Sequence, residues 1–104
     1  MITIYSLVAD KRNKLHKTLK EVANDAEISI PFLSDIEHGR RNPSDSQVKK
    51  LTKALELDSD YMFFLLGKFP MDVKKSGLSQ KQVERIMKQV RLMIESNKIK
   101  NKEV

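Results

Sequence analysis

The sequence has no cysteine and only two histidines, His16 and His38, among its 104 residues. Without cysteine there can be no disulfide bond, no thiolate metal site and no cysteine nucleophile. A zinc site would need carboxylates at ligand spacings from the histidines, and the sequence does not contain them. Nor does it contain a recognisable nucleophile–base pair or a glycine-rich phosphate loop. We therefore expect no cofactor, no metal site and no enzymatic activity.

Glycine, proline and aromatic residues are also scarce, with three glycines, three prolines and 6% aromatics. Sandwiches and barrels use many turn residues and strand formers, whereas helix-forming residue types dominate this chain. Hydrophobic residues make up 39% of the chain and are spread along it, which is enough for a small core. The composition therefore favours an all-α protein.

Long apolar runs are missing as well, and the N-terminal stretch MITIYSLVAD has no basic residue ahead of its apolar part. A membrane span needs about 20 mostly apolar residues in a row. A secretory signal needs a positively charged start. These patterns lead us to expect a cytoplasmic protein with no membrane partner.

Positive charge is present in excess, with a formal net charge of +6. Residues 1–70 carry 11 basic and 10 acidic side chains, whereas residues 71–104 carry 9 basic and 4 acidic ones. The net charge indicates a polyanionic partner. The uneven distribution places most of the excess in the C-terminal third of the chain.

Apolar residues recur at helical spacing in six segments, near residues 3–15, 18–26, 29–38, 44–57, 58–66 and 79–96. Capping-box pairs open three of these segments: Thr18 with Glu21, Ser44 with Gln47, and Ser79 with Gln82. The Lys- and Asn-rich residues after Ser96 are expected to fray.

The third segment has clear start and stop signals. Ser29 is a good N-cap, Pro31 is tolerated in the first turn, and Gly39 is suited to a left-handed C-terminal cap. Together with the short segment before it, this gives two short helices joined by a tight turn at residues 25–28. In a helix-turn-helix unit, the first helix supports the second, which enters the major groove of DNA.

The residues of this unit resemble the XRE family of phage-repressor-like helix-turn-helix regulators. The resemblance rests on Thr18-Leu-Lys-Glu-Val-Ala23 and on Ile28-Ser-Ile-Pro-Phe-Leu-Ser-Asp-Ile-Glu-His-Gly-Arg-Arg-Asn-Pro43, and it extends from about Leu7 to Gly67. It implies a five-helix Cro/CI-repressor-like DNA-binding bundle in residues 1–69. Residues 70–104 would then add a C-terminal amphipathic helix.

The resemblance also implies roles for individual residues. The helix from Ser29 to His38 would read bases with Ile30, Pro31, Phe32, Ser34 and Asp35. Phosphate contacts are implied for Lys17, Lys20, Ser29, Arg40, Arg41 and Asn42. Arg12 and Glu37 would form a structural ion pair. Many members carry glutamine where this chain has Leu19, so that phosphate contact is lost here or replaced by Lys17 or Lys20.

The expected reading helix is unusually apolar for this task. Its apolar residues suit thymine methyl groups, the Ser34 hydroxyl suits either base type, and the Asp35 carboxylate suits the N4 amino group of cytosine. This helix has no Arg or Gln that could make bidentate hydrogen bonds to a base. Part of the specificity is therefore expected to come from DNA shape.

The C-terminal segment carries an apolar stripe that needs a partner surface. The stripe can fold back on the bundle or form a homodimer interface with Phe64 and Phe69, and we favour the interface because the bundle is complete by Gly67. The stripe consists of Val83, Ile86, Met87, Val90, Met93 and Ile94.

The resulting hypothesis is a dimeric repressor that binds double-stranded DNA at a palindromic operator. One alternative is a DNA binder regulated by a partner, such as an antitoxin or an immunity regulator of a mobile element, whose C-terminal helix binds another protein. A second alternative is a protein-interaction module that has lost DNA binding.

Overall fold

The structure is a computed structural model that describes residues 2–103, with side chains for residues 2–98. The described residues form seven α-helices and no strand, which confirms the all-α prediction. The chain divides into two compact units, one ending at Pro70 and the other starting at Met71. We describe each unit separately.

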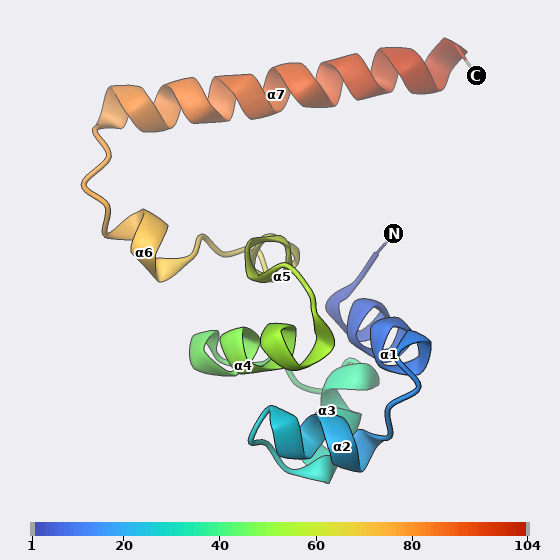
Figure 1. Ribbon diagram of the computed structural model, residues 1–104. Coiled ribbons are helices and arrows are strands. Elements are labelled where there is room, and N and C mark those ends of the chain that lie inside the picture. The colour runs from blue at the N-terminus through green and yellow to red at the C-terminus, as the bar shows by residue number, and fades with distance from the viewer. Residues whose placement is uncertain (1, 104) are drawn as a thin grey trace. The chain divides into compact units, whose positions relative to one another are not determined.

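The first unit is a bundle of five helices (Figure 1). α1 packs on α3 and α4, α2 packs on α3 and α4, and α5 packs on α4. This arrangement confirms the predicted five-helix bundle. The helices are α1 (Ile4–Lys14), α2 (Leu19–Asp25), α3 (Ile30–Glu37), α4 (Asp45–Leu55) and α5 (Ser59–Leu65).

Each of these helices begins at a residue whose side chain accepts a hydrogen bond from a backbone N–H in the first turn. The capping boxes predicted at Thr18 and Ser44 are both present. α1 has a further box, in which Thr3 is paired with Ser6, that was not predicted. It was missed because the usual signature has Glu or Gln at the third helical position. The N-caps are Thr3, Thr18, Ser29, Ser44 and Asp58.

The core lies between the five helices and consists of aliphatic residues with one phenylalanine. Two of the core residues are alanines, one in α2 and one at its C-terminal end. The buried apolar residues are Ile4, Val8, Val22, Ala23, Ala26, Leu33, Ile36, Val48, Leu51, Leu55, Met62 and Phe63.

α4 is shorter than predicted. It ends at Leu55 because Glu56 has a left-handed backbone conformation with a φ of 55°. Leu57 therefore lies outside the helix, although it still packs against the core. Its backbone N–H donates to the Thr52 carbonyl at 2.8 Å, which closes the helix end.

The second unit contains the short α6 (Met71–Lys74) and the long α7 (Gln80–Glu103) (Figure 1). α6 was not predicted because four residues are too few to show a helical period. α7 continues past Ser96 to Glu103, so the segment that was expected to fray is helical in the structure as far as Glu103. Residues 97–103 contain no glycine or proline and are rich in lysine, a good helix former. The capping box of Ser79 with Gln82 is present at the start of α7.

Candidate nucleic-acid interface

The helix-turn-helix unit consists of α2, α3 and the turn between them. Glu27 in this turn has a φ of 57°, and the Ile28 N–H donates to the Ala23 carbonyl at 2.9 Å. At the start of α3, the Ser29 hydroxyl accepts from the Phe32 N–H at 3.1 Å. The turn and the cap therefore fix where α3 begins relative to α2.

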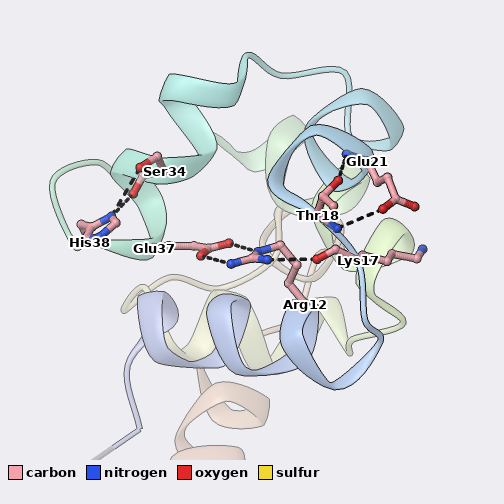
Figure 2. Close-up of polar contacts among 7 residues, drawn as sticks. All are labelled: Arg12, Lys17, Thr18, Glu21, Ser34, Glu37 and His38. Carbon is pink, nitrogen blue, oxygen red and sulfur yellow. Dashed lines mark hydrogen bonds and ion pairs between the residues drawn. The ribbon is translucent and has the colours of Figure 1, made fainter.

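A two-pronged ion pair ties α3 to α1 (Figure 2). Arg12 Nε donates to Glu37 Oε2 at 2.7 Å, and Arg12 Nη2 donates to Glu37 Oε1 at 3.0 Å. Arg12 Nη1 also donates to the Lys17 carbonyl at 2.9 Å. The hydrogen bond to Glu37 raises the pKa of Arg12. This is the pair that the family resemblance implies, and it anchors the C-terminal end of α3.

The exposed face of α3 lies opposite its buried residues. Leu33 and Ile36 have no exposed surface, whereas Ile30 is 43% exposed and Pro31 is also exposed. Ser34 and Asp35 are partly exposed on the same side. Of the five positions expected to read bases, these four form the outer surface of the helix, whereas Phe32 is half-buried and packs against the core.

His38 extends this outer face, although no role was expected for its side chain. Its Nδ1 lies 2.7 Å from the Ser34 carbonyl and 3.5 Å from the Ser34 hydroxyl (Figure 2). The spacing of four residues on a helix predicts that the two side chains are neighbours. That spacing is the signal that would have added His38 to the candidate site.

The arginines after α3 fold back onto it. Arg40 Nε donates to Asp35 Oδ1 at 2.9 Å, and Arg41 Nε lies 3.5 Å from Asp35 Oδ2. The Arg41 guanidinium also lies over the Phe32 ring, 5.5 Å from its centroid. The Asp35 carboxylate, expected to accept from cytosine, thus pairs with two arginines in the DNA-free protein.

The other residues expected to contact phosphates differ in whether their side chains contact the rest of the bundle or are exposed to solvent. Lys17 Nζ lies 3.3 Å from the Ala54 carbonyl and 3.7 Å from Asp25 Oδ2, so it is engaged within the bundle. Lys20 and Asn42 are exposed. Of the two lysines expected to replace the glutamine contact at Leu19, Lys17 is therefore the one tied to the rest of the bundle.

Apolar side chains are exposed on both units. Phe64 is 71% exposed and stacks on Tyr61 with ring centroids 6.5 Å apart, and Phe69 is 53% exposed. On α7, every described side chain is exposed. The six stripe residues, Val83, Ile86, Met87, Val90, Met93 and Ile94, are between 37% and 60% exposed.

Among the helices described, none combines the length and the apolar character that crossing a membrane requires. Within the same residues, no group of three or more His, Cys, Asp or Glu side chains could hold a metal ion.

Comparison with known proteins agrees with this geometry. The sequence model of the helix-turn-helix family matches residues 8–62, which is more than half of the chain. A solved chain of the SinR protein/SinI protein complex superposes with a TM-score of 0.54, covering 89% of this chain and 99% of that one at 21% identity. This similarity supports the fold.

Three curated relatives are named as transcriptional regulators. The uncharacterized HTH-type transcriptional regulator Rv0474 of Mycobacterium tuberculosis is 28% identical over 62 residues, which is 60% of this chain and 44% of the relative. The transcriptional regulator ClgR of the same species is 42% identical over 41 residues, 39% of this chain and 37% of ClgR. The HTH-type transcriptional regulator DdrOP3 of Deinococcus deserti is 52% identical over 33 residues, 32% of this chain and 26% of DdrOP3.

The matches thus span less than half the length of each of these relatives. The match to the family model, over residues 8–62, includes the whole of α2, α3 and α4. On the strength of the family match over residues 8–62, the chain belongs to the XRE family of helix-turn-helix proteins.

Proposed function

We propose that this protein is a sequence-specific transcriptional repressor that inserts α3 into the major groove of its operator. The observation that carries the proposal is the exposed face of α3. An ion pair with α1 anchors this helix, and Arg40 and Arg41 border its exposed face. A recognition helix must keep a fixed position on its domain so that side chains meet base edges in register. The Arg12–Glu37 pair and the Ser29 cap supply that fixed position.

The charge balance of the first unit favours specific over non-specific binding. Residues 1–70 carry 11 basic and 10 acidic side chains, so their overall attraction for a polyanion is weak. Non-specific binding depends almost entirely on such attraction. The first unit must therefore gain affinity from local contacts on and beside α3.

We propose that the apolar stripe of α7 packs against the same stripe of a second copy of this chain. On a helical projection, Gln82 and Gln89 border one side of the stripe, and Glu84 and Arg91 border the other. One border is uncharged and the other, which also includes Lys98, carries charges of both signs, so two copies can pair without a run of like charges along the whole seam. The stripe residues are at least 37% exposed and apolar, which is what a homodimer core requires.

A dimer of this kind binds two half-sites on one face of the duplex. With two-fold symmetry the operator is a palindrome, with half-site centres about 10 base pairs or a multiple of that apart. Repression follows if the bound dimer blocks polymerase access to an overlapping promoter.

A second candidate is a DNA binder regulated by another protein that occupies the α7 stripe. The observation that favours it is the similarity to a chain from a complex of two proteins, SinR and SinI. An antitoxin or an immunity regulator of a mobile element would work in this way. The oligomeric state of the purified protein distinguishes the two candidates, because only the homodimer hypothesis predicts that the isolated protein associates with itself.

Selection from a pool of randomised duplex DNA tests the proposal. The full chain should enrich one palindromic sequence with the half-site spacing given above. Enrichment of a single half-site would contradict the dimeric mode. Failure to enrich any sequence, with weak and uniform binding, would contradict sequence-specific DNA recognition altogether.

A further inference from the structure

The guanidinium of Arg41 lies against the surface of α3. It is 5.5 Å from the centre of the Phe32 ring, and its Nε is 3.5 Å from Asp35 Oδ2. Phe32 and Asp35 are three residues apart and are therefore neighbours on the helix surface. An aromatic face and a carboxylate together restrain both the plane and the direction of a guanidinium.

Arg40 fixes the loop that carries Arg41. The Arg40 backbone N–H donates to the Asp35 carbonyl at 2.8 Å, and its Nε donates to Asp35 Oδ1 at 2.9 Å. The left-handed conformation of Gly39, with a φ of 73°, turns the chain back at this point. The loop after α3 is thus held to α3 through both backbone and side chain.

We propose that Arg41 reads a guanine in the major groove and that Asp35 is the positioning residue that orients it. This inference rests on the proposed function, in which α3 enters the groove. No Arg, Lys, Gln or Asn lies between Ile30 and Glu37, so α3 itself has no side chain suited to a two-pronged base contact. Arg41 supplies the missing group from the adjacent loop.

The chemistry of the free end of Arg41 fits guanine. Its pairing with Asp35 uses Nε, and its two terminal nitrogens have no hydrogen-bond partner among residues 2–98. Guanine presents O6 and N7 as two acceptors in the major groove, and a guanidinium donates to both at once. The Arg41 side chain is 61% exposed, so its end is accessible to DNA.

Arg40 is the less suitable of the two arginines for this role. Arg40 also pairs with the Asp35 carboxylate, but it is the guanidinium of Arg41 that lies over the Phe32 ring. An arginine restrained at one point suits a phosphate, which accepts donors from many directions. We therefore keep the assignment of Arg40 to the DNA backbone.

The test compares variants of the full chain in selection from randomised duplex DNA. The wild type is expected to enrich a guanine at one position of each half-site. Arg41→Lys keeps the charge but loses the planar fork, so preference for that guanine should fall roughly five- to hundred-fold. Arg40→Lys is the comparison: it keeps the backbone hydrogen bond of residue 40 to Asp35, so it should weaken binding to all duplexes by a similar factor and leave the guanine in the enriched sequence.

Asp35→Asn tests the positioning role without removing either arginine. It should weaken the preference for the same guanine, and Asp35→Glu should retain more of that preference than Asp35→Asn does. Base preference is the informative measurement, because a purely structural role of Asp35 would change the midpoint of unfolding and leave the preferred base unchanged.

Three results would overturn parts of the inference. If Arg41→Lys weakens binding to all duplexes by one factor and leaves the enriched sequence unchanged, Arg41 is a phosphate contact. If Asp35→Asn leaves the guanine preference intact while Arg41→Lys removes it, Asp35 has no positioning role. If the wild type enriches no sequence, the proposed function itself is wrong, and the inference is wrong with it.

Discussion

Arg12 of α1 and Glu37 of α3 form two parallel hydrogen bonds of 2.7 and 3.0 Å, with side chains that are only 15% and 7% exposed. The residues are 25 positions apart in the sequence, so the pair links two helices that have no local connection. Arg12 also binds the Lys17 carbonyl, which fixes the segment leading into α2. One side chain therefore stabilises the positions of three helices around the candidate interface.

Replacing Glu37 by glutamine should lower the free energy of unfolding by roughly 3 kcal/mol, because the change leaves Arg12 largely buried without its counter-charge. Urea denaturation followed by circular dichroism measures this. Glu56→Gln is the matched control, because Glu56 is exposed, and it should change the stability by less than about 0.5 kcal/mol. Equal stabilities of the two variants would show that the Arg12–Glu37 pair does not hold the bundle together.

The capping box of α2 should make stability depend on pH. The backbone N–H of Thr18, together with its hydroxyl, lowers the pKa of Glu21 below its ordinary value of 4.5. Because the pKa of Glu21 is lowered in the folded state, its carboxylate stabilises the protein at pH values above the ordinary pKa. This contribution is lost as the pH falls through the lowered pKa.

The measurement is the unfolding free energy of wild type and Glu21→Gln at pH 7 and at about pH 3. The wild type should be the more stable at pH 7, and the difference should shrink at the acidic pH. A difference that is the same at both pH values would show that the carboxylate charge of Glu21 is not involved.

Gly39→Ala should destabilise the protein more than Gly67→Ala. Both glycines have a φ of 73°, so both substitutions introduce similar backbone strain, on the order of 1 kcal/mol. A Cβ at Gly39 would also lie 3.1 Å from Tyr5 Cδ1, whereas a Cβ at Gly67 would meet nothing within 4 Å.

Thermal unfolding of the two variants separates strain from crowding. The excess effect of Gly39→Ala should disappear when Tyr5 is also replaced by alanine. If both single variants unfold at the same temperature, Tyr5 does not pack tightly on the end of α3.

Val90→Asp should abolish self-association, whereas Leu92→Asp should not. Val90 lies in the middle of the apolar stripe, and Leu92 projects from the opposite side of α7 with 55% exposure. A charge in the centre of an apolar interface should weaken dimerisation by at least about 100-fold, since burying an unpaired charge costs several kcal/mol. Sedimentation equilibrium gives the dimer dissociation constant. A wild type that stays monomeric, or equal effects of both variants, would contradict the homodimer.

Local signals predicted most of the first unit. Thr18, Ser29 and Ser44 cap helices as expected because an N-cap depends on residues within one turn of it. The end of α4 differs from the prediction because Glu56 adopts a left-handed conformation. Such a helix end is usually marked by glycine, and no glycine lies near Glu56 in the sequence. The length of α7 was underestimated because lysine-rich termini occur in both helices and disordered segments.

The candidate site was harder to predict in detail because its side chains interact across a loop. That Asp35 pairs with Arg40 and Arg41 depends on the chain reversing at Gly39, and no helical period extends through that reversal. The family resemblance implies a phosphate contact for Lys17, but the contact of Lys17 with the Ala54 carbonyl joins residues 37 positions apart. Contacts of this kind depend on the folded arrangement of the helices.

The most direct test is a salt titration of binding to the DNA upstream of the protein's own gene and to a random duplex. Non-specific binding weakens steeply between about 50 and 200 mM salt because it depends on counterion release. If α3 reads sequence, the upstream DNA should bind roughly a thousand-fold more tightly than the random duplex. Equally weak and equally salt-dependent binding to both would contradict an autoregulatory repressor that reads its operator through α3.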